Sequence, residues 1–150
     1  METTFKLAGN FDTELLIQFI QEFYKYDGHP FDEATLGTAL AKILNDDSLG
    51  RVWLIQQDSQ VIGYIILTFG YSLEYRGRDA FIDEFYIRER HRGQGLGRKT
   101  IQFVEEVCPS LGIHALHIEV ERNNTAAQSF YRKVDFKDQD SYLMTKWTIA

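Results

Sequence analysis

Three consecutive runs rich in β-branched and aromatic residues constrain the fold of this chain more than any other feature. They cover residues 51–56, 61–71 and 80–87, and polar segments at 57–60 and 74–79 separate them. Runs of this composition between short polar turns are typical of antiparallel strands joined by hairpins. The sequence therefore predicts a three-stranded meander at the centre of the fold.

Helical patterns lie on both sides of this meander. Apolar residues three and four positions apart predict helices, and capping residues, glycine and proline predict their ends. The helices are expected over residues 12–23, 32–44, 95–110 and 124–133, and further short strands over 4–8, 115–120 and 142–148. Because a helix separates the strand at 80–87 from the next strand, these two should run parallel with a right-handed crossover. The expected fold class is mixed α/β, with helices packed on a mixed sheet.

Composition limits the class of protein. The chain has 150 residues, of which 44% are hydrophobic and 25% charged, so we expect a single globular domain over residues 1–150. Its formal net charge of −6 disfavours binding to a nucleic-acid backbone. No apolar run is long enough for a membrane helix, and the first residues lack the pattern of a signal peptide. These observations predict a cytoplasmic protein with no nucleic-acid or membrane partner.

The cysteine and histidine content argues against metal and disulfide chemistry. The single cysteine, Cys108, excludes an internal disulfide, and the four histidines show no metal-ligand spacing. Cys108 also falls at helical period with Ile101 and Val104, so we expect a structural thiol. No metal is expected.

A glycine-rich segment lies between the strand at 80–87 and the helix that follows it. Gly93, Gly95 and Gly97 alternate with larger residues there. Without Cβ atoms, such a backbone can turn its N–H groups toward one point, and a helix N-terminus adds a positive dipole end. The spacing matches neither the dinucleotide fingerprint nor the P-loop. The segment therefore predicts a site for the phosphates of some other ligand, unless it is merely a flexible turn.

Two motifs in this order resemble a known family. Arg92-x-x-Gly95-x-Gly97 opens one helix, and Asn124-x-x-Ala127-x-x-x-Tyr131 spans a later one. Together they resemble the GNAT superfamily of CoA-dependent N-acetyltransferases. Residues 69–78 and 83–87 are also similar, more weakly, to the diamine and thialysine acetyltransferase branch of that superfamily.

The resemblance implies a fold and an activity. The fold would be a mostly antiparallel twisted sheet of about six or seven strands, splayed between strands 4 and 5 and flanked by four helices. The activity would be transfer of acetyl from acetyl-CoA to a primary amine of a small molecule, such as a polyamine, an amino acid or an aminoglycoside. Acetylation of protein lysines or N-termini, a catalytically silent acyl-CoA sensor, and an interaction module without a nucleotide ligand are the alternatives. A homodimer is compatible with the resemblance.

The resemblance also assigns the residues that hold the cofactor. The main chain of the glycine-rich segment would bind the CoA diphosphate, the strand residues before it would pair with the pantetheine arm, and the second motif would contact the arm and the thioester. These residues are Phe85, Tyr86, Ile87, Arg92, Gly93, Gln94, Gly95, Leu96, Gly97, Arg98, Asn124 and Tyr131. Family members often have glycine where this chain has Asp135, and aspartate tolerates a left-handed helix end less well.

Direct attack of an amine on acetyl-CoA needs a proton acceptor and a proton donor. Asp83 and Glu84 are the candidate bases, and Asp83 is favoured because adjacent strand residues face opposite sides and the branch resemblance selects the first acid. A surface or salt-bridged carboxylate is the alternative for each. Tyr131 is the candidate donor to the departing thiolate, unless its ring serves only to pack beside Phe130.

Aromatic and acidic residues at two places suit a cationic acceptor amine. Tyr24 and Asp27 lie near the joint between the first two helices, and Tyr71 and Glu74 lie near the turn before the strand at 80–87. Ordinary packing and surface roles fit these four residues equally well. The sequence does not identify the acceptor.

Overall fold

The chain forms two compact units in a computed structural model that describes residues 1–149. They are Met1–Glu119 and the segment from Val120 onward. Within the described residues, no helix is long and apolar enough to cross a membrane. The first unit contains the whole sheet and the residues expected to hold a diphosphate.

The first unit is built on one sheet whose five strands follow one another in chain order. They are β1 (Thr3–Leu7), β2 (Gly50–Gln57), β3 (Gln60–Ser72), β4 (Gly77–Ile87) and β5 (Ala115–His117). The strands from β1 to β4 pair antiparallel, and β4 pairs with β5 in parallel. The predicted meander and the predicted parallel crossover are therefore confirmed.

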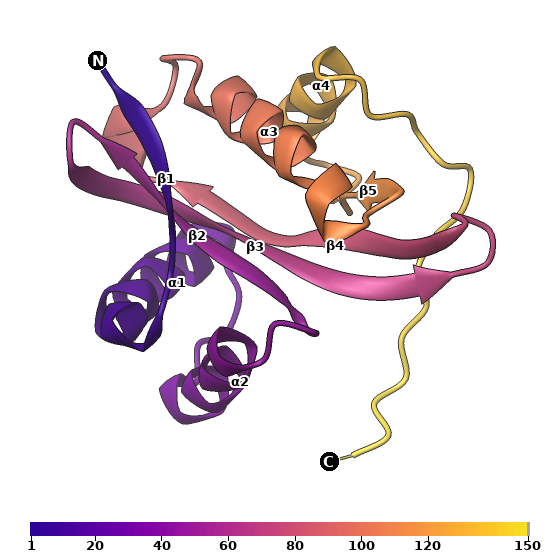
Figure 1. The fold of residues 1–150 in the computed structure, drawn as a ribbon, viewed down its shortest axis with the longest axis horizontal. Helices are drawn as coiled ribbons and strands as arrows, with labels where there is room; N and C mark the ends of the chain where they lie inside the picture. The colour runs from indigo at the N-terminus through magenta and orange to yellow at the C-terminus, as the bar shows by residue number, and fades with distance from the viewer. Residues whose placement is uncertain (150) are drawn as a thin grey trace. The chain divides into compact units, whose positions relative to one another are not determined.

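Helices cover both faces of this sheet. Figure 1 shows α1 (Thr13–Asp27) and α2 (Glu33–Asn45) on one face and α3 (Leu96–Val107) on the other. Single turns of 3₁₀ helix precede α1, link β4 to α3, and follow α3. These turns are Asn10–Asp12, Glu89–His91 and Pro109–Leu111.

The two faces bury different sets of side chains. Phe19 of α1 is fully buried and packs edge-on against Tyr64 of β3, with ring centroids 6.4 Å apart. On the other face, Phe103 of α3 stacks on Phe5 at 4.4 Å and meets Trp53 at 5.3 Å. Full burial of side chains of this size contributes about 1.5–3 kcal/mol each, so each helix is held by its apolar stripe.

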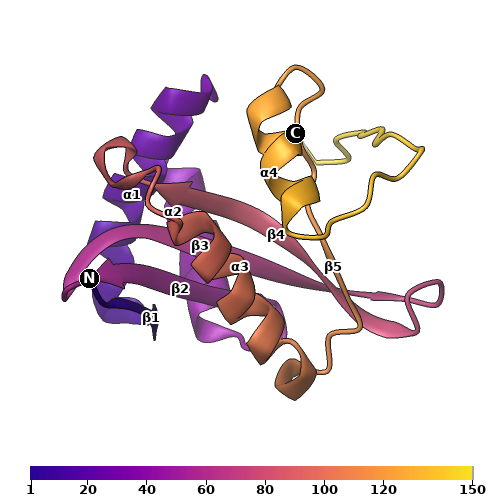
Figure 2. The ribbon, with the colours of Figure 1, turned by 90° about the horizontal axis from the view of Figure 1, so that it is seen from above.

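β4 separates from β5 after a short stretch of pairing. Only three residue pairs join the two strands, with Asp79 opposite Ala115 and Phe81 opposite His117. β4 then continues to Ile87, and within the described residues no strand pairs with this last part on its β5 side. Figure 2 shows the two strands diverging. The expected splay between strands 4 and 5 is present.

A β-bulge lies in β4 at the start of the unpaired stretch. Ile66 of β3 pairs with Glu84, but its neighbour Leu67 pairs with Ile82, so Asp83 is the extra residue. A bulge bends its strand and re-aims the side chains around it. Strict alternation of side chains across β4 therefore fails at Asp83.

The second unit contains one helix, α4 (Thr125–Lys133). The side-chain oxygen of Asn124 accepts a hydrogen bond from the Ala127 N–H at 3.1 Å, which caps the first turn. At the other end Asp135 adopts φ +74°, and the Phe136 N–H donates to the Tyr131 carbonyl at 3.0 Å. The end of α4 is thus built around an aspartate in the left-handed conformation.

The prediction of a strand over residues 142–148 is wrong. These residues form no regular structure, and their large apolar side chains are exposed, as Trp147 is to 88%. A segment forms a strand only beside a partner that takes its backbone hydrogen bonds, and no strand pairs with this segment among residues 1–149. The sheet therefore has five strands, not the expected six or seven. The predicted strand over 115–120 is also shorter, ending at His117.

Candidate active site

The segment between β4 and α3 folds into a tight loop with two left-handed glycines. Gly93 and Gly95 both have φ +77°, a conformation that costs other residues about 1–2 kcal/mol. Arg92 fixes the start of the loop, because its Nε donates to the Ile87 carbonyl at 2.7 Å and its guanidinium lies over the Tyr26 ring at 4.5 Å. The side chain of Arg92 thus stabilises the loop.

The N–H groups of this loop form a candidate anion-binding site. Among the described residues, no backbone or side-chain acceptor takes a hydrogen bond from the N–H groups of residues 93–98. The Arg92 N–H, in contrast, donates to the Glu89 carbonyl at 3.1 Å. Residues 96–98 form the first turn of α3, where the helix dipole favours negative charge. These N–H groups are the donors that phosphate oxygens accept from, so this loop is the candidate site for a phosphate or diphosphate group.

The last residues of β4 lead straight into this loop. Phe85 and Ile87 pack in the apolar cluster beneath the start of α3, and Tyr86 is buried toward α1. Their backbone forms the open edge that β5 leaves unpaired. An extended chain with amide groups, such as a pantetheine arm, can pair with an edge of this kind.

Glu84 is held by two tyrosines on the face of the sheet that α1 covers. The Tyr24 hydroxyl donates to Glu84 Oε2 at 2.5 Å, and the Tyr64 hydroxyl donates to Oε1 at 2.8 Å. Burial raises the pKa of Glu84, although both hydrogen bonds act in the opposite direction. Burial also raises the pKa of both tyrosines, so their hydroxyls stay protonated as donors. Both carboxylate oxygens of Glu84 therefore have a partner.

Asp83 differs from its neighbour. It keeps an exposed surface, and none of the hydrogen bonds among the described side chains involves its carboxylate. The surrounding protein raises the pKa of Asp83 by desolvation. The charge of Asp83 in turn raises the pKa of Glu84 and of Tyr24, so the three groups share one electrostatic environment. Asp83 is the acid of the pair with free oxygens.

The end of α1 brings a further acid and several aromatic rings to this region. The helix continues to Asp27, one turn past its apolar pattern, and Tyr24 and Asp27 lie on that turn. Asp27 Oδ2 lies 2.8 Å from His29 Nε2, and the His29 ring lies 5.9 Å from Tyr24. Phe31 meets the other side of Tyr24 at 6.3 Å. Of the predicted acceptor residues, Tyr24 contacts Glu84 directly, and Asp27 is linked to Tyr24 through His29.

Tyr71 and Glu74 are not brought into this group. Tyr71 is 80% exposed near the end of β3, and it is five residues from Ile66, the partner of Glu84. Five residues along a strand place two side chains on opposite faces of the sheet. Glu74 lies in the turn between β3 and β4.

The structure adds a hydrogen-bonded pair, Asp79 and His117, that the sequence did not indicate. Asp79 Oδ2 lies 3.0 Å from His117 Nε2, and both side chains are largely buried. The His117 ring lies between the rings of Tyr75 at 4.5 Å and Phe81 at 4.9 Å. The carboxylate partner of His117 is 38 residues away in the chain, and no local pattern marks such a pair.

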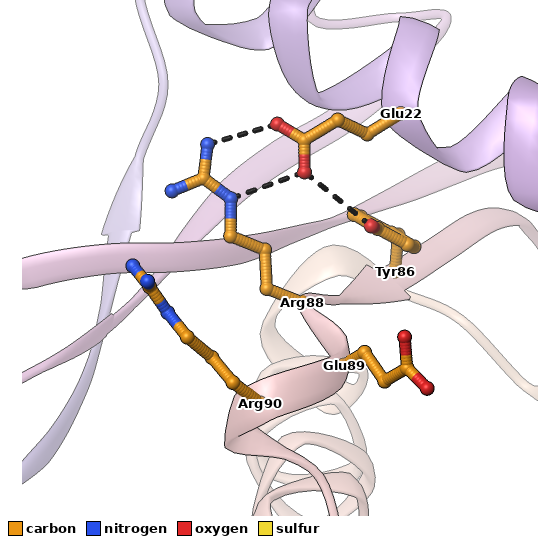
Figure 3. Close-up of a pocket in the computed structure, with 5 residues that line it drawn as sticks. All are labelled: Glu22, Tyr86, Arg88, Glu89 and Arg90. Carbon is orange, nitrogen blue, oxygen red and sulfur yellow. Dashed lines mark hydrogen bonds and ion pairs between the residues drawn. The ribbon is translucent and has the colours of Figure 1, made fainter.

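An open cleft of about 620 Å³ lies at the end of β4 (Figure 3). Arg88 in this cleft forms a two-pronged ion pair with Glu22, at 3.1 and 2.9 Å, which raises the pKa of Arg88. The Tyr86 hydroxyl also donates to Glu22 at 3.4 Å. Figure 3 shows no interaction between Arg90 and Glu22, and the Arg90 Nε donates to His91. Arg90 is therefore the lining cation that no carboxylate neutralises in the described part of the chain.

The second unit carries the other predicted site residues. Burial raises the pKa of Tyr131 to about 12, so its hydroxyl is protonated at neutral pH. Its ring packs against Phe130 at 5.0 Å and Phe136 at 5.4 Å. The Tyr131 side chain thus both packs against its neighbours and carries a protonated hydroxyl. Among residues 1–149, no cluster of three or more histidine, cysteine or acidic side chains could hold a metal ion.

Known proteins are similar in sequence to parts of this chain. The model of the acetyltransferase (GNAT) family matches residues 14–136. The thialysine N-epsilon-acetyltransferase of Bos taurus is 33% identical over 78 residues, which are 52% of this chain and 45% of that protein. The D-amino-acid N-acetyltransferase of Saccharomyces cerevisiae is 37% identical over 57 residues, covering 38% of this chain and 35% of that protein. The chain spans about half the length of the curated relatives it matches.

Solved structures share the fold over nearly the whole chain. An integron cassette protein from the mobile metagenome of Cole Harbour Salt Marsh has a TM-score of 0.86 and 31% identity, covering 97% of this chain and 91% of that one. A predicted acetyltransferase from Clostridium acetobutylicum, solved with acetyl-CoA, has a TM-score of 0.81 at 18% identity, covering 97% and 96%. The second likeness concerns the fold alone. Because the family model covers most of its length, this chain belongs to the acetyltransferase (GNAT) family.

Proposed function

We propose that this protein is an acetyl-CoA-dependent N-acetyltransferase that acts on a primary amine of a small molecule. One observation carries the proposal: the open edge of β4 runs directly into a loop whose N–H groups have no acceptor among the described residues. Bound there, acetyl-CoA supplies the acetyl group as a thioester. The family match spans residues 14–136, which supports one acetyltransferase domain over residues 1–150.

In this proposal, most of the contacts that hold the cofactor come from the main chain. The N–H groups of residues 93–98 bind the diphosphate, and the edge of residues 85–87 pairs with the amides of the pantetheine arm. Arg90 and Arg98 add positive charge near the phosphates. A backbone N–H of the same edge holds the thioester oxygen. Asn124 contacts the arm, as the family resemblance implies.

Asp83 is the proposed proton acceptor. A primary amine near pKa 10.4 is about 3.4 units above neutral pH, so its deprotonation costs about 4.6 kcal/mol without help. Asp83 has free oxygens and a raised pKa, both of which suit a base that works near neutral pH. Glu84 has both oxygens engaged by tyrosines, so its role is to orient the end of α1.

Tyr131 is the proposed proton donor to the departing thiolate. The resemblance supplies this role, and the raised pKa of its hydroxyl keeps the proton in place at neutral pH. The attack is direct, and no nucleophile of the protein takes part. Burial raises the pKa of the Cys108 thiol, which supports its exclusion as a nucleophile.

The acceptor class follows from Glu84 and the side chains at the end of α1 and just after it. Two acids, Glu84 and Asp27, and the rings of Tyr24 and Phe31 favour a cation. The relatives are named for thialysine and D-amino acids, and a structural neighbour is an aminoglycoside acetyltransferase solved with sisomicin. These names support small primary amines as acceptors.

Release of CoA across a panel of amines tests this function. The panel contains a diamine, a lysine-like amino acid, an aminoglycoside and a lysine peptide. We expect turnover with at least one small amine and a loss of about 10²–10⁴-fold in Asp83→Asn, but not in the exposed control Asp140→Asn. Turnover of the peptide alone would identify a protein acetyltransferase. Binding of acetyl-CoA without turnover would identify a sensor, and no binding would contradict the cofactor assignment.

A further inference from the structure

Gln57, at the end of β2, is a buried polar residue that reaches into the glycine-rich loop. Three polar or charged residues are buried in the described part of the chain, namely Gln57, Asp79 and Thr100. Asp79 pairs with His117, and the Thr100 hydroxyl donates to the Leu96 carbonyl within α3. Gln57 alone among them connects two elements through its side-chain amide.

The amide of Gln57 makes two hydrogen bonds that span the start of the loop. Its Oε1 lies 3.2 Å from His91 Nδ1, and its Nε2 donates to Gln94 Oε1 at 3.0 Å. Residues 92 and 93 lie between these two contacts. The amide therefore ties both ends of a four-residue segment to the rigid end of β2.

The direction of these bonds is internally consistent. Because Gln57 Oε1 is an acceptor, His91 Nδ1 carries a proton. His91 Nε2 is then free to accept from Arg90 Nε, which lies 3.3 Å away. The His91 tautomer with its proton on Nδ1 satisfies both of these contacts at once. The network thus extends from β2 to the cationic side chain of Arg90 in the open cleft.

These two hydrogen bonds of Gln57 matter because a glycine-containing loop is costly to order. Glycine loses more backbone freedom on ordering than any other residue, and Gly93 lies inside the braced segment. A loop held in its binding conformation before the ligand arrives spares the ligand that entropy. The N–H groups of residues 93–98 can then meet a diphosphate without rearrangement.

We infer that Gln57 is a positioning residue for the CoA diphosphate: it holds residues 91–94 so that the following N–H groups converge on the phosphates. This inference rests on the proposed function. Gln57 acts through the loop, not on the thioester or the amine. Its removal should therefore raise the KM for acetyl-CoA and leave kcat and the KM for the amine nearly unchanged.

The test compares Gln57→Met with a matched control. Methionine keeps the size of the side chain and removes both hydrogen bonds. Gln56→Met changes the neighbouring glutamine, whose half-buried side chain accepts a hydrogen bond from Thr4 at 3.3 Å. We expect the KM for acetyl-CoA to rise about tenfold in Gln57→Met, as the loss of two neutral hydrogen bonds implies. Gln56→Met should match the wild type.

A truncated cofactor separates positioning from general damage. S-acetyl pantetheine has the thioester and the arm but no diphosphate, so its KM should be the same in wild type and Gln57→Met. An equal rise for both cofactors would show a packing defect and would overturn the inference. No rise for acetyl-CoA, in a wild type that binds it, would also overturn it. A wild type that does not bind acetyl-CoA in calorimetry would contradict the proposed function itself.

A double-mutant cycle with Gln94 adds a second criterion. Gln94→Met removes only one of the two bonds, and we expect a rise of about threefold in KM. The double variant Gln57→Met with Gln94→Met should be no worse than Gln57→Met, because the same bond is lost in both. Full additivity of the two effects would show that Gln57 does not act through the loop.

Discussion

The Tyr24 hydroxyl on α1 donates a hydrogen bond of 2.5 Å to Oε2 of Glu84 on β4. This contact joins the last turn of α1 to the strand at the point where its edge opens. The Tyr64 hydroxyl occupies the other oxygen at 2.8 Å, so Glu84 is an anchor for the helix end. The free carboxylate at the same place is Asp83, at the bulge.

The pH dependence of catalysis should separate these two acids. Desolvation raises the pKa of Asp83, so the acidic limb of kcat/KM should lie above the ordinary aspartate range. Asp83→Asn should lower kcat by about 10²–10⁴-fold and remove that limb. Glu84→Gln should keep the limb, because Asp83 remains. Equal and negligible effects of the two variants would exclude both from the reaction.

Loss of the Tyr24 hydroxyl should destabilise the protein more at high pH than at low pH. Burial raises the pKa of Glu84, so its ionisation destabilises the fold as pH rises through that pKa. The Tyr24 hydrogen bond opposes this effect because it favours the charged form. Tyr24→Phe should therefore lower the free energy of unfolding by about 1–3 kcal/mol at pH 8 and by less at pH 4.

Urea unfolding at the two pH values measures the effect of Tyr24→Phe. Tyr71→Phe is the control, because Tyr71 is 80% exposed and should show no change. A loss for Tyr24→Phe that is the same at both pH values would mean that its hydroxyl does not stabilise the charged form of Glu84.

Replacement of Gly95 by alanine should lower both the stability of the protein and its affinity for acetyl-CoA. It has φ +77°, where a Cβ meets no neighbour but strains the backbone, so Gly95→Ala should lower stability by about 1 kcal/mol. It should also weaken acetyl-CoA binding, because the free N–H groups lie around it. Gly37 in α2 is the matched control: its Cβ also meets no neighbour, and Gly37→Ala should raise stability by about 0.5–1 kcal/mol. If Gly95→Ala binds acetyl-CoA as tightly as wild type, the loop is not the phosphate site.

Asp135 should limit the stability of the helix in the second unit. At φ +74° an aspartate is strained where glycine is not, so Asp135→Gly should stabilise α4 by about 1 kcal/mol. Asp140→Gly, at a position without positive φ, should not stabilise it. Amide hydrogen exchange of residues 128–134 reports the local effect. Faster exchange in Asp135→Gly than in wild type would contradict the strain.

The sequence predicts the elements whose signals are local. The meander follows from three β-rich runs and their turns, and the loop at 92–98 follows from its glycines and the helix behind it. The family motifs led to the same loop, and the family match confirms the resemblance. Local signals of this kind do not depend on which distant segments meet.

The features that the sequence does not predict depend on distant partners. The Tyr24–Glu84 bond joins residues 60 apart in the chain, and nothing near either residue indicates the other. The bulge at Asp83 arises from the register between β3 and β4, which residue types alone do not set. The segment 142–148 is rich in aromatic, aliphatic and threonine residues but has no neighbouring strand within residues 1–149. The residue types of this segment alone therefore predicted a strand that does not form.

The central claim is that the main chain of residues 93–98 binds the diphosphate of CoA. Titration of the ¹⁵N-labelled protein with CoA, followed by amide NMR, tests it directly. The account predicts large shifts of the Gly93, Gly95 and Gly97 amides and no shift of Gly28 or Gly112, which have similar backbone conformations elsewhere. Saturation of CoA binding without movement of the three loop glycines would contradict it.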